Sequence, residues 1–507
     1  GDLGLEVGGD DPAAEREVVV EVPSVKRGGW GLSPRSTRSR VSEERASEKA
    51  AAASSRWRAA RASRVSAAGR ATSGVKDDQP KRASSFRSSG PRGSGLRGSA
   101  LRRPDSVVVT SHGKKTKDFE HLIRIQTLSV HKGPIWAMEF SRGAEYVATA
   151  GQDTIVYIWL VGLGSEGYSA YGSPGDSANQ LIDVKRELPA LENEAALGGQ
   201  RDRNSHESDV LDNVVDSKPY RKFMGHASDV LDLSWSKHNF LLSSSLDKTV
   251  RMWHPQKTQC LCRFDHSDFV TTVSFHPYDD HIFLSGSVDG NVRLWSTTPP
   301  RTVSMVHVED SVTTSTINRD GKTAIVGTYT GCCKFYSITL PGGKWSLKCT
   351  QEMEIRSKKN IAPRKITGFS FFPQSEDFLI TSNDSRLRVY QGESPPVLIR
   401  KFSGLKNRKG SMKGSVESSG RYLLCGSETR QVFIWDLLGR GETPSHNSRV
   451  EASESFYPHQ HSDISHAMFA PFPGDDPAVP ASGLVIASSS YDGEIVFFLN
   501  AAREPRG

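Results

Sequence analysis

Short runs in which hydrophobic and polar residues alternate fill the chain between residues 118 and 500, and their order repeats. The two most regular copies are consecutive. Residues 221–253 read RKFMGHASDVLDLSWSKHNFLLSSSLDKTVRMW, and residues 262–295 read CRFDHSDFVTTVSFHPYDDHIFLSGSVDGNVRLW. Alternation with a period of two is typical of half-buried β-strands. A repeat of about 42 residues with this content is typical of the blades of a β-propeller.

Polar and aromatic residues hold fixed places in these copies. In the first, His226 precedes the first strand, Ser243 lies ten residues before Trp253, and Asp247 lies six residues before it. The second copy repeats this order with His266, Ser285, Asp289 and Trp295. A spacing that recurs with the same residue types indicates one structural unit used several times.

The aromatic residue that ends the third strand of each copy allows the copies to be counted. These residues are Trp159, Trp253, Trp295, Tyr336, Tyr390, Trp435 and Phe498. The first spacing is 94 residues whereas the others are 41 to 63, which indicates an insertion over residues 162–217, rich in Gly, Ser, Asn and acidic residues. Asp lies six residues before the aromatic residue in five copies, as Asp153, Asp247, Asp289, Asp384 and Asp492, and Thr330 and Thr429 take this place in the others. The sequence therefore predicts seven blades.

Each blade also needs a fourth strand. Residues 220–224, 260–264, 301–306, 344–349, 397–402 and 453–457 supply six of them. The last copy has no residues left for one after Asn500, whereas residues 122–128 form a strand ahead of the first copy. We expect residues 122–128 to complete the last blade and close the ring, because an open blade would expose hydrogen-bonding edges. The predicted fold is all-β: a seven-bladed β-propeller over residues 118–500, closed by an N-terminal strand and followed by a tail over residues 501–507.

We predict that the repeated polar residues brace the blades. The His and the Asp fall in loops on one rim, so the imidazole can donate to the carboxylate while a hydroxyl and the indole N–H extend the network. The full set occurs in the first three copies: His131, Thr149, Asp153 and Trp159; His226, Ser243, Asp247 and Trp253; His266, Ser285, Asp289 and Trp295. The seventh copy is expected to use His461, Ser488 and Asp492. Convergent Ser, His and Asp also suggest a hydrolase triad, but their repetition favours a structural role, and we expect no catalytic residue and no cofactor.

Charge is unevenly distributed. Residues 1–117 carry 24 Lys and Arg against 13 Asp and Glu, whereas the whole chain has a net charge of +7. From residue 24 to about residue 103 the sequence is mainly Ser, Arg, Gly and Ala, which cannot bury enough apolar surface to fold, so we expect a disordered basic region. A GxGxxG match at Gly93 to Gly98 has no strand before it and no helix after it, and it is not expected to bind a nucleotide. The six cysteines show no Cys-x-x-Cys spacing and indicate reduced thiols rather than disulfides or a metal site.

Copies five and six depart from the pattern. Val326, Ile380 and Cys425 stand in copies four to six where the remaining copies have Ser or Thr, and no His precedes the first strands of copies five and six. The leading loops of copies five and six, which come before the first strand, are basic. They supply the candidate partner-binding residues Arg356, Lys358, Lys359, Arg364, Lys365, Lys401, Lys406, Arg408 and Lys409, and the second loop also carries Lys413. The corresponding loops of copies three and four carry Asp268, Glu309 and Asp310. We predict a positive sector beside a negative one, suited to an acidic protein surface or an anionic lipid; ordinary solvated loops are an equal alternative.

Several strings make the family recognisable. KKTKDFEHLIRIQTLSVHKGPIWAMEFS, CLCRFDHSDFVTTVSFHPYDDHIFLSGSVDGNVRLW, GTYTGCCKFY, RKITGF and TSNDSRLRVY resemble the WD repeat-containing protein 44 family, rabphilin-like effectors of a Rab GTPase. The resemblance covers residues 107–498 and implies a WD40-type propeller without catalytic activity. It also implies a cytoplasmic scaffold in vesicle trafficking, peripheral on endosomal or Golgi membranes, with protein partners that include an endosomal Rab GTPase. Residues 1–117 contain no string that matches the Rab-binding segment of the family.

The sequence thus favours a non-enzymatic scaffold for protein–protein interaction. The Arg-rich region keeps one alternative open, a nuclear adaptor associated with nucleic acid. Neither function requires a small-molecule substrate.

Overall fold

The computed structural model describes residues 106–114, 117–162, 214–355, 364–392, 395–437, 448–450, 452–471 and 483–501. All of them belong to one compact unit, Ala46–Gly507. The predicted disordered region over residues 24–103 lies outside the described residues. So do most of the insertion, residues 163–213, and residues 502–507.

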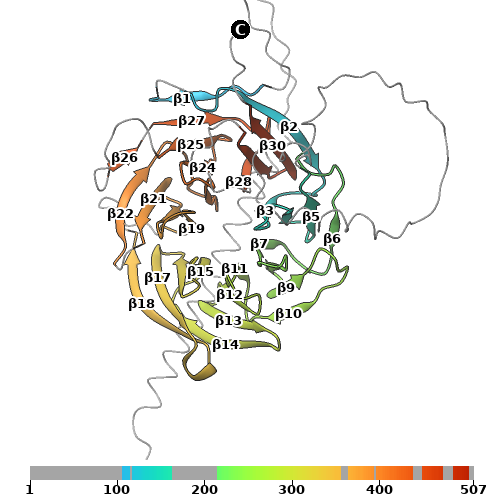
Figure 1. The fold of residues 1–507 in the computed structure, drawn as a ribbon, viewed down its shortest axis with the longest axis vertical. Coiled ribbons are helices and arrows are strands. Elements are labelled where there is room, and N and C mark those ends of the chain that lie inside the picture. The colour runs from blue at the N-terminus through green and yellow to red at the C-terminus, as the bar shows by residue number, and fades with distance from the viewer. Residues whose placement is uncertain are drawn as a thin grey trace, which may run out of the picture. The chain divides into compact units, whose positions relative to one another are not determined.

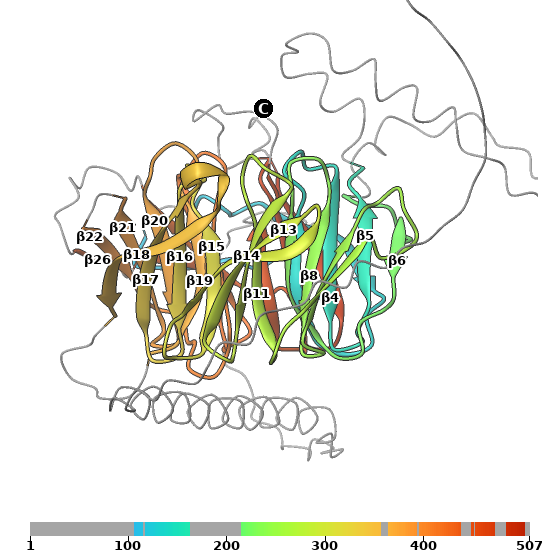
Figure 2. The same ribbon diagram turned by 90° about the horizontal axis from the view of Figure 1, so that it is seen from below.

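Seven sheets surround a common centre in the described part of the chain (Figure 1). The strands run between two rims formed by loops (Figure 2). This arrangement is a seven-bladed β-propeller, and it confirms the predicted fold class and the predicted number of blades.

Blades one to four each contain four strands. They are β3 (Ile135–Phe140), β4 (Tyr146–Gly151), β5 (Val156–Leu160) and β6 (Arg221–Phe223); β7 (Val230–Trp235), β8 (Leu241–Ser245), β9 (Thr249–Trp253) and β10 (Cys262–Asp265); β11 (Val270–Phe275), β12 (Ile282–Ser287), β13 (Asn291–Thr297) and β14 (Pro300–His307); and β15 (Val312–Ile317), β16 (Thr323–Thr328), β17 (Cys332–Thr339) and β18 (Ser346–Glu354). A short 3₁₀ helix, η1 (Pro341–Gly343), joins β17 to β18.

Blades five and six each carry a fifth strand. Blade five contains β19 (Ile366–Phe371), β20 (Phe378–Ser382), β21 (Arg386–Gln391), β22 (Val397–Phe402) and β26 (Ser448–Val450); blade six contains β23 (Gly414–Val416), β24 (Tyr422–Gly426), β25 (Val432–Asp436), β27 (Ser453–Phe456) and β1 (Thr110–His112); and blade seven contains β28 (Ile464–Phe469), β29 (Val485–Ser490), β30 (Glu494–Asn500) and β2 (Leu122–Ser129).

The closing strand is where the sequence places it. β2 pairs antiparallel with β30 from Leu122 opposite Asn500 to Ser129 opposite Glu494, so the two ends of the propeller share blade seven (Figure 1). The six predicted fourth strands also exist, as β6, β10, β14, β18, β22 and β27. Each was predictable because the repeat leaves one strand per blade unassigned.

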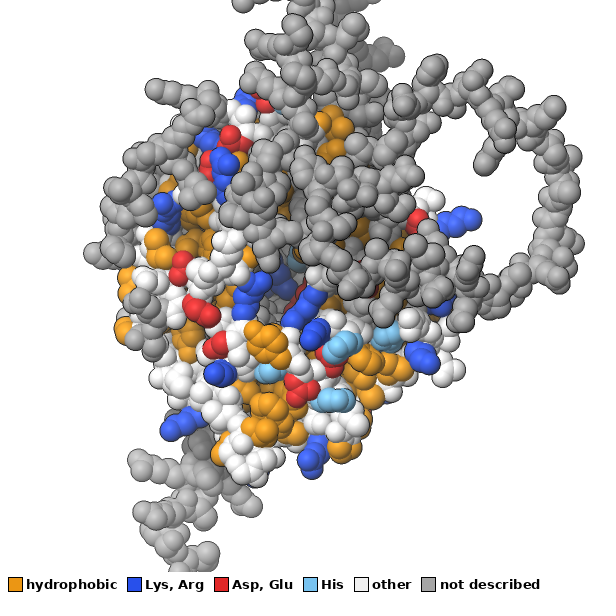
Figure 3. Space-filling model, viewed as in Figure 1, with side chains coloured by type: hydrophobic (Ala, Val, Ile, Leu, Met, Phe, Trp, Pro, Cys, Tyr) orange, Lys and Arg blue, Asp and Glu red, His pale blue; other side chains and the backbone are white. Residues whose placement is uncertain are grey.

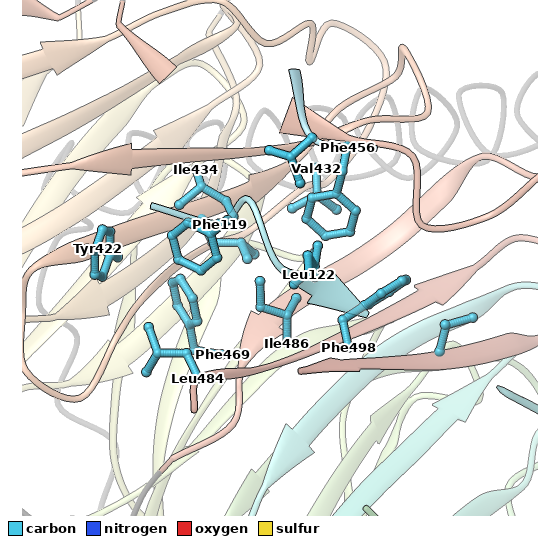
Figure 4. Close-up of a cluster of buried hydrophobic side chains, with 14 of the residues drawn as sticks. Phe119, Leu122, Tyr422, Val432, Ile434, Phe456, Phe469, Leu484, Ile486 and Phe498 are labelled. Carbon is cyan, nitrogen blue, oxygen red and sulfur yellow. The ribbon is translucent and has the colours of Figure 1, made fainter. Parts of the chain in front are cut away.

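The hydrophobic core lies between neighbouring blades. The second strand of each blade is buried along almost its whole length, as in β12 and β29, because the adjacent blades cover both of its faces. Between blades six and seven, Phe119 and Leu122 pack with side chains of both sheets (Figure 4). The ring of Phe119 meets that of Tyr422 edge-on, with 5.2 Å between centroids.

Side chains of one blade hydrogen-bond the backbone N–H groups on the innermost strand of the next blade. The innermost strand of a blade has no partner strand on the side facing the centre. Oδ2 of Asp232 accepts the N–H of Val273 at 3.2 Å, and Oγ of Ser234 accepts that of Phe275 at 3.0 Å. The same relation joins Ser415 in blade six to Phe469 in blade seven at 3.3 Å. Backbone groups that would otherwise be buried without partners are thereby satisfied.

Two strands were not expected. β1 pairs with β27 at the outer edge of blade six, and β26 pairs in parallel with β22 at the outer edge of blade five. Residues before 118, the predicted boundary, therefore take part in the propeller, since Ser106 already bridges to Ile123. Three-residue strands show no period of their own, and their partners lie far away in the sequence.

Candidate functional site

In blades one and two the predicted brace residues form a continuous hydrogen-bonded chain. His226 lies between Asp247 and Ser243: its Nδ1 is 2.8 Å from Oδ2 of Asp247, and its Nε2 is 2.7 Å from Oγ of Ser243. The indole N–H of Trp253 donates to the same hydroxyl at 2.8 Å. Burial opposes ionisation of Asp247, but the bonds from His226 and Thr249 outweigh it and lower the pKa of this carboxyl. A neutral imidazole with the proton on Nδ1 gives every donor an acceptor.

Blade one repeats this geometry. Nδ1 of His131 is 2.9 Å from Asp153, its Nε2 is 2.9 Å from Oγ1 of Thr149, and Trp159 donates to Thr149 at 3.0 Å. The network ties the leading loop of each blade to the turn between its second and third strands. It stabilises the rim, and the repeated His and Ser are explained without catalysis.

Blade three differs from the prediction. His266 bonds Ser285 at 2.8 Å, and Ser285 accepts the indole N–H of Trp295 at 2.8 Å. Asp289 does not contact this imidazole; it pairs instead with Arg293 at 2.9 Å. Burial and the positive charge of Arg293 lower the pKa of His266 to about 4. Arg293 and the hydroxyl of Ser267 both bond Oδ2 of Asp289, so this carboxylate is engaged by them instead of by the histidine.

In blade seven the predicted His461 is the wrong residue. His461 is exposed, and the buried imidazole that lies 3.1 Å from Oγ of Ser488 belongs to His459. Its Nδ1 faces Glu494 at 3.4 Å, so Glu494 takes the place predicted for Asp492. Two histidines two residues apart could not be distinguished by spacing alone.

The brace is replaced rather than missing in blades four to six. In blade four, Oδ2 of Asp310 accepts both the N–H and the hydroxyl of Thr330, at 2.9 and 2.7 Å. In blade five, the buried Asp384 pairs with Arg388 at 2.5 Å and with Arg364 at 3.0 Å. In each case a loop side chain again meets the turn between the second and third strands, with different chemistry.

Among the residues that the structure describes, the candidate partner-binding residues do not form one patch. Arg356, Lys358 and Lys359 lie outside the described residues. Arg364 is held by Asp384 as described above, and Lys365 is buried with its ammonium 2.6 Å from Oγ of Ser411. Lys401 is half-buried on β22, whereas Lys406, Arg408 and Lys409 are exposed. The positive sector predicted across two blades is therefore reduced, in the described residues, mainly to the last three.

These three residues share one well-fixed loop, residues 404–413, which we call the blade-six loop. Oε1 of Glu428 accepts the backbone N–H groups of Arg408, Lys409 and Gly410 at 2.8, 2.5 and 2.8 Å. Ser427 accepts the N–H of Lys406 at 2.9 Å. With its amides turned inward, the loop holds its basic side chains outward. Sequence reasoning missed Glu428, although its place in the turn next to Thr429 was a usable signal.

One acid of the predicted negative sector is engaged in hydrogen bonds within the propeller. Asp310 is occupied by Thr330 as described above, while Glu309 is exposed. On the face shown in Figure 3, basic, acidic and hydrophobic side chains are interspersed over the part that is not grey. Charge alone therefore does not single out a docking surface on that visible part.

The described residues contain no group of three or more His, Cys, Asp or Glu side chains placed to hold a metal ion. Within the same residues, no helix is long and apolar enough to cross a membrane.

Comparison with known proteins identifies the repeat in the three most regular copies. The family model described as WD domain, G-beta repeat matches residues 123–159, 217–254 and 258–296. These segments end at or next to Trp159, Trp253 and Trp295, so the match falls on the copies with the complete set of brace residues.

Three relatives match a longer part of the chain. WD repeat-containing protein 44 of Xenopus laevis is 36% identical over 383 residues, which cover 72% of this chain and 40% of that protein. An uncharacterized WD repeat-containing protein of Schizosaccharomyces pombe is 30% identical over 317 residues, 61% of this chain and 48% of that protein. The 2-deoxy-glucose resistant protein 2 of Saccharomyces cerevisiae is 29% identical over 347 residues, 60% of this chain and 39% of that protein. The chain spans less than half the length of each relative.

Proposed function

Because the chain belongs to the WD repeat-containing protein 44 family of WD-repeat proteins, we propose that it is a non-enzymatic scaffold that brings proteins together in vesicle trafficking, as an effector of an endosomal Rab GTPase. A rigid ring with many loops on its rims suits this role, since several partners can dock without any change in the fold.

The blade-six loop is the observation that carries the proposal. Lys406, Arg408 and Lys409 are exposed, while Glu428 fixes the backbone beneath them. A preordered loop loses little conformational entropy when a partner binds, and its positive charge favours encounter with an acidic surface. The partner that this loop suits is therefore an acidic protein surface, and we assign it to the GTPase or to a protein bound with it.

Localisation of the tagged full chain tests the proposal. We expect cytoplasmic puncta that coincide with an endosomal Rab, and we expect them to disperse when Lys406, Arg408 and Lys409 are all replaced by Glu. A control with Lys237, Lys257 and Lys348 replaced by Glu, which are exposed on other blades, should keep the puncta. Nuclear enrichment of the wild-type chain would instead support the nucleic-acid adaptor. Binding to vesicles with and without phosphoinositide distinguishes a lipid from a protein as the anionic partner.

A further inference from the structure

The centre of the propeller is a cavity of about 210 Å³ lined by the innermost strand of every blade. Strand pairing places equivalent residues of the innermost strands at the same height along the cavity, which we call the reference level. Met138, Leu233 and Ala467 lie at this level, opposite Thr149, Ser243 and Ser488 of the second strands. The residues just before this level form an upper ring: Ala137, Asp232, Thr272, Thr314, Gly368, Lys413 and His466. The residues just after it form a lower ring: Glu139, Ser234, Ser274, Thr316, Ser370, Ser415 and Met468.

The charges of the two rings do not balance. In the upper ring, Nζ of Lys413 pairs with Oδ1 of Asp232 at 2.5 Å, across the cavity from blade six to blade two. In the lower ring, Glu139 is the only charged residue, and its Oε2 is shielded from solvent and has no hydrogen-bond partner among the described residues. The rings thus hold two carboxyl groups and one ammonium group, and the ammonium is already engaged.

A second side chain in the cavity also lacks a partner. His466 is 8% exposed and lines the cavity, and its Nδ1 makes no hydrogen bond within the part of the chain that the structure describes. Burial and the nearby Lys413 lower the pKa of this imidazole to about 3, so it is neutral and has a nitrogen lone pair to offer. Both unsatisfied groups can accept an N–H bond.

Glu139 is unfavourable as it stands. Burial and the charge of Asp232 raise the pKa of its carboxyl to about 8, although Lys413 and Arg142 act in the opposite direction. Arg142, on the adjacent rim, instead donates to the carbonyl of Pro277 at 2.5 Å. A shielded carboxyl oxygen without a hydrogen-bond partner costs stability, and a cation that entered the cavity would reduce this cost.

We propose that the central cavity binds one cationic N–H group, a guanidinium or an ammonium, between Glu139 and His466. The cavity is smaller than the roughly 300–1,000 Å³ of sites for drug-sized ligands, so it suits a single arginine or lysine side chain of a partner or a small free organic cation. The positive charge of Arg142 would repel a cation that entered the cavity from the rim carrying this residue. We therefore expect weak binding, with a dissociation constant on the order of 1 mM. This site is independent of the blade-six loop and of the proposed function.

Titration of the full chain with matched probes tests the site. The probes are methylguanidinium chloride and the peptides acetyl-Gly-Arg-Gly-amide and acetyl-Gly-citrulline-Gly-amide, at constant ionic strength. We expect saturable binding and a higher melting temperature with the two cations and no response to the neutral citrulline peptide. Tighter binding of the arginine peptide than of methylguanidinium would identify a partner side chain as the ligand, and equal binding would identify a free cation.

Substitution of Glu139 distinguishes a role in cation binding from a purely structural role of this residue. Glu139→Gln should weaken cation binding about tenfold or more while the ligand-free variant melts at the same or a higher temperature at pH 8. Glu120→Gln, at an exposed position, should bind as the wild type does. Equal responses to arginine and citrulline peptides, unchanged binding by Glu139→Gln, a strongly lowered melting temperature of that variant, or preferential binding of acetyl-Gly-Asp-Gly-amide would overturn the proposal.

Discussion

Nδ1 of His226 lies 2.8 Å from Oδ2 of Asp247, and the same oxygen accepts the backbone N–H of Ala227 at 3.0 Å. The other carboxylate oxygen accepts the N–H and the hydroxyl of Thr249, at 2.9 and 2.6 Å. One side chain thus holds the leading loop of blade two against the turn that begins its third strand. Asp247 is therefore a structural residue.

Replacing Asp247 by Ala should lower the free energy of unfolding by about 3 kcal/mol, because several buried donors lose their shared acceptor. Equilibrium unfolding in urea measures the loss. Asp265→Ala is the matched control in the same blade. Asp265 is exposed and pairs with the exposed Arg263, so a change within about 0.5 kcal/mol is expected. Equal losses for the two variants would contradict the structural role of Asp247.

Trp435 in blade six offers a substitution that should raise stability. Its buried indole N–H has no partner among the described residues, because Cys425 stands at the position where, in blade two, Ser243 accepts the indole N–H of Trp253. Cys425→Ser should supply this acceptor and raise the free energy of unfolding by about 1 kcal/mol. Cys425→Ala removes the thiol without adding an acceptor and should be less stable than the wild type. A serine variant no more stable than the alanine variant would show that the indole is satisfied in another way.

Acid should destabilise the propeller partly through His266. The pKa of the folded imidazole is about 4, against 6.5 for an ordinary histidine, so the unfolded state binds more protons between these values. Stability therefore falls as the pH falls through this window. Between pH 7 and pH 5 the contribution of this residue is about 2 kcal/mol.

Urea unfolding at the two pH values measures this effect. His266→Gln should show a smaller loss of stability between pH 7 and pH 5 than the wild type does. His281→Gln, at an exposed position, should show the same loss as the wild type. An unchanged pH dependence in His266→Gln would rule out this residue as a source of acid sensitivity.

Glu454 fixes the N-terminal segment to blade six. Its carboxylate is fully buried; Oε1 contacts Nζ of Lys114 at 2.8 Å, and the two oxygens accept the N–H groups of Asp118 and Phe119 at 3.0 Å each. Glu454→Ala should lower the free energy of unfolding by about 3 kcal/mol and speed amide hydrogen exchange in residues 110–119. Glu120→Ala, at an exposed position in the same segment, should leave exchange there unchanged. Equal exchange in both variants would mean that other contacts hold the segment.

The sequence predicted those features that repeat. Seven blades, their fourth strands and the closing strand follow from one pattern, since each copy supplies the same strands in the same order. β1 and β26 could not be found in this way, because three-residue strands depend on distant partners. The same limit applies to the site: Arg364 and Lys365 look like surface cations in the sequence, but Asp384 and Ser411 engage them. The cavity residues Glu139 and Lys413 are brought together only by ring closure.

The central claim is that the chain is a scaffold whose blade-six loop docks an endosomal Rab GTPase or a protein bound with it. Titration of the full chain with endosomal Rab proteins, each loaded with GTP or GDP, tests it most directly. We predict binding of at least one GTP-loaded Rab, at least about tenfold weaker binding of its GDP form, and a similar loss in the variant with Lys406, Arg408 and Lys409 replaced by Glu at unchanged melting temperature. Absence of binding to every GTP-loaded Rab, or binding unaffected by this variant, would contradict the claim.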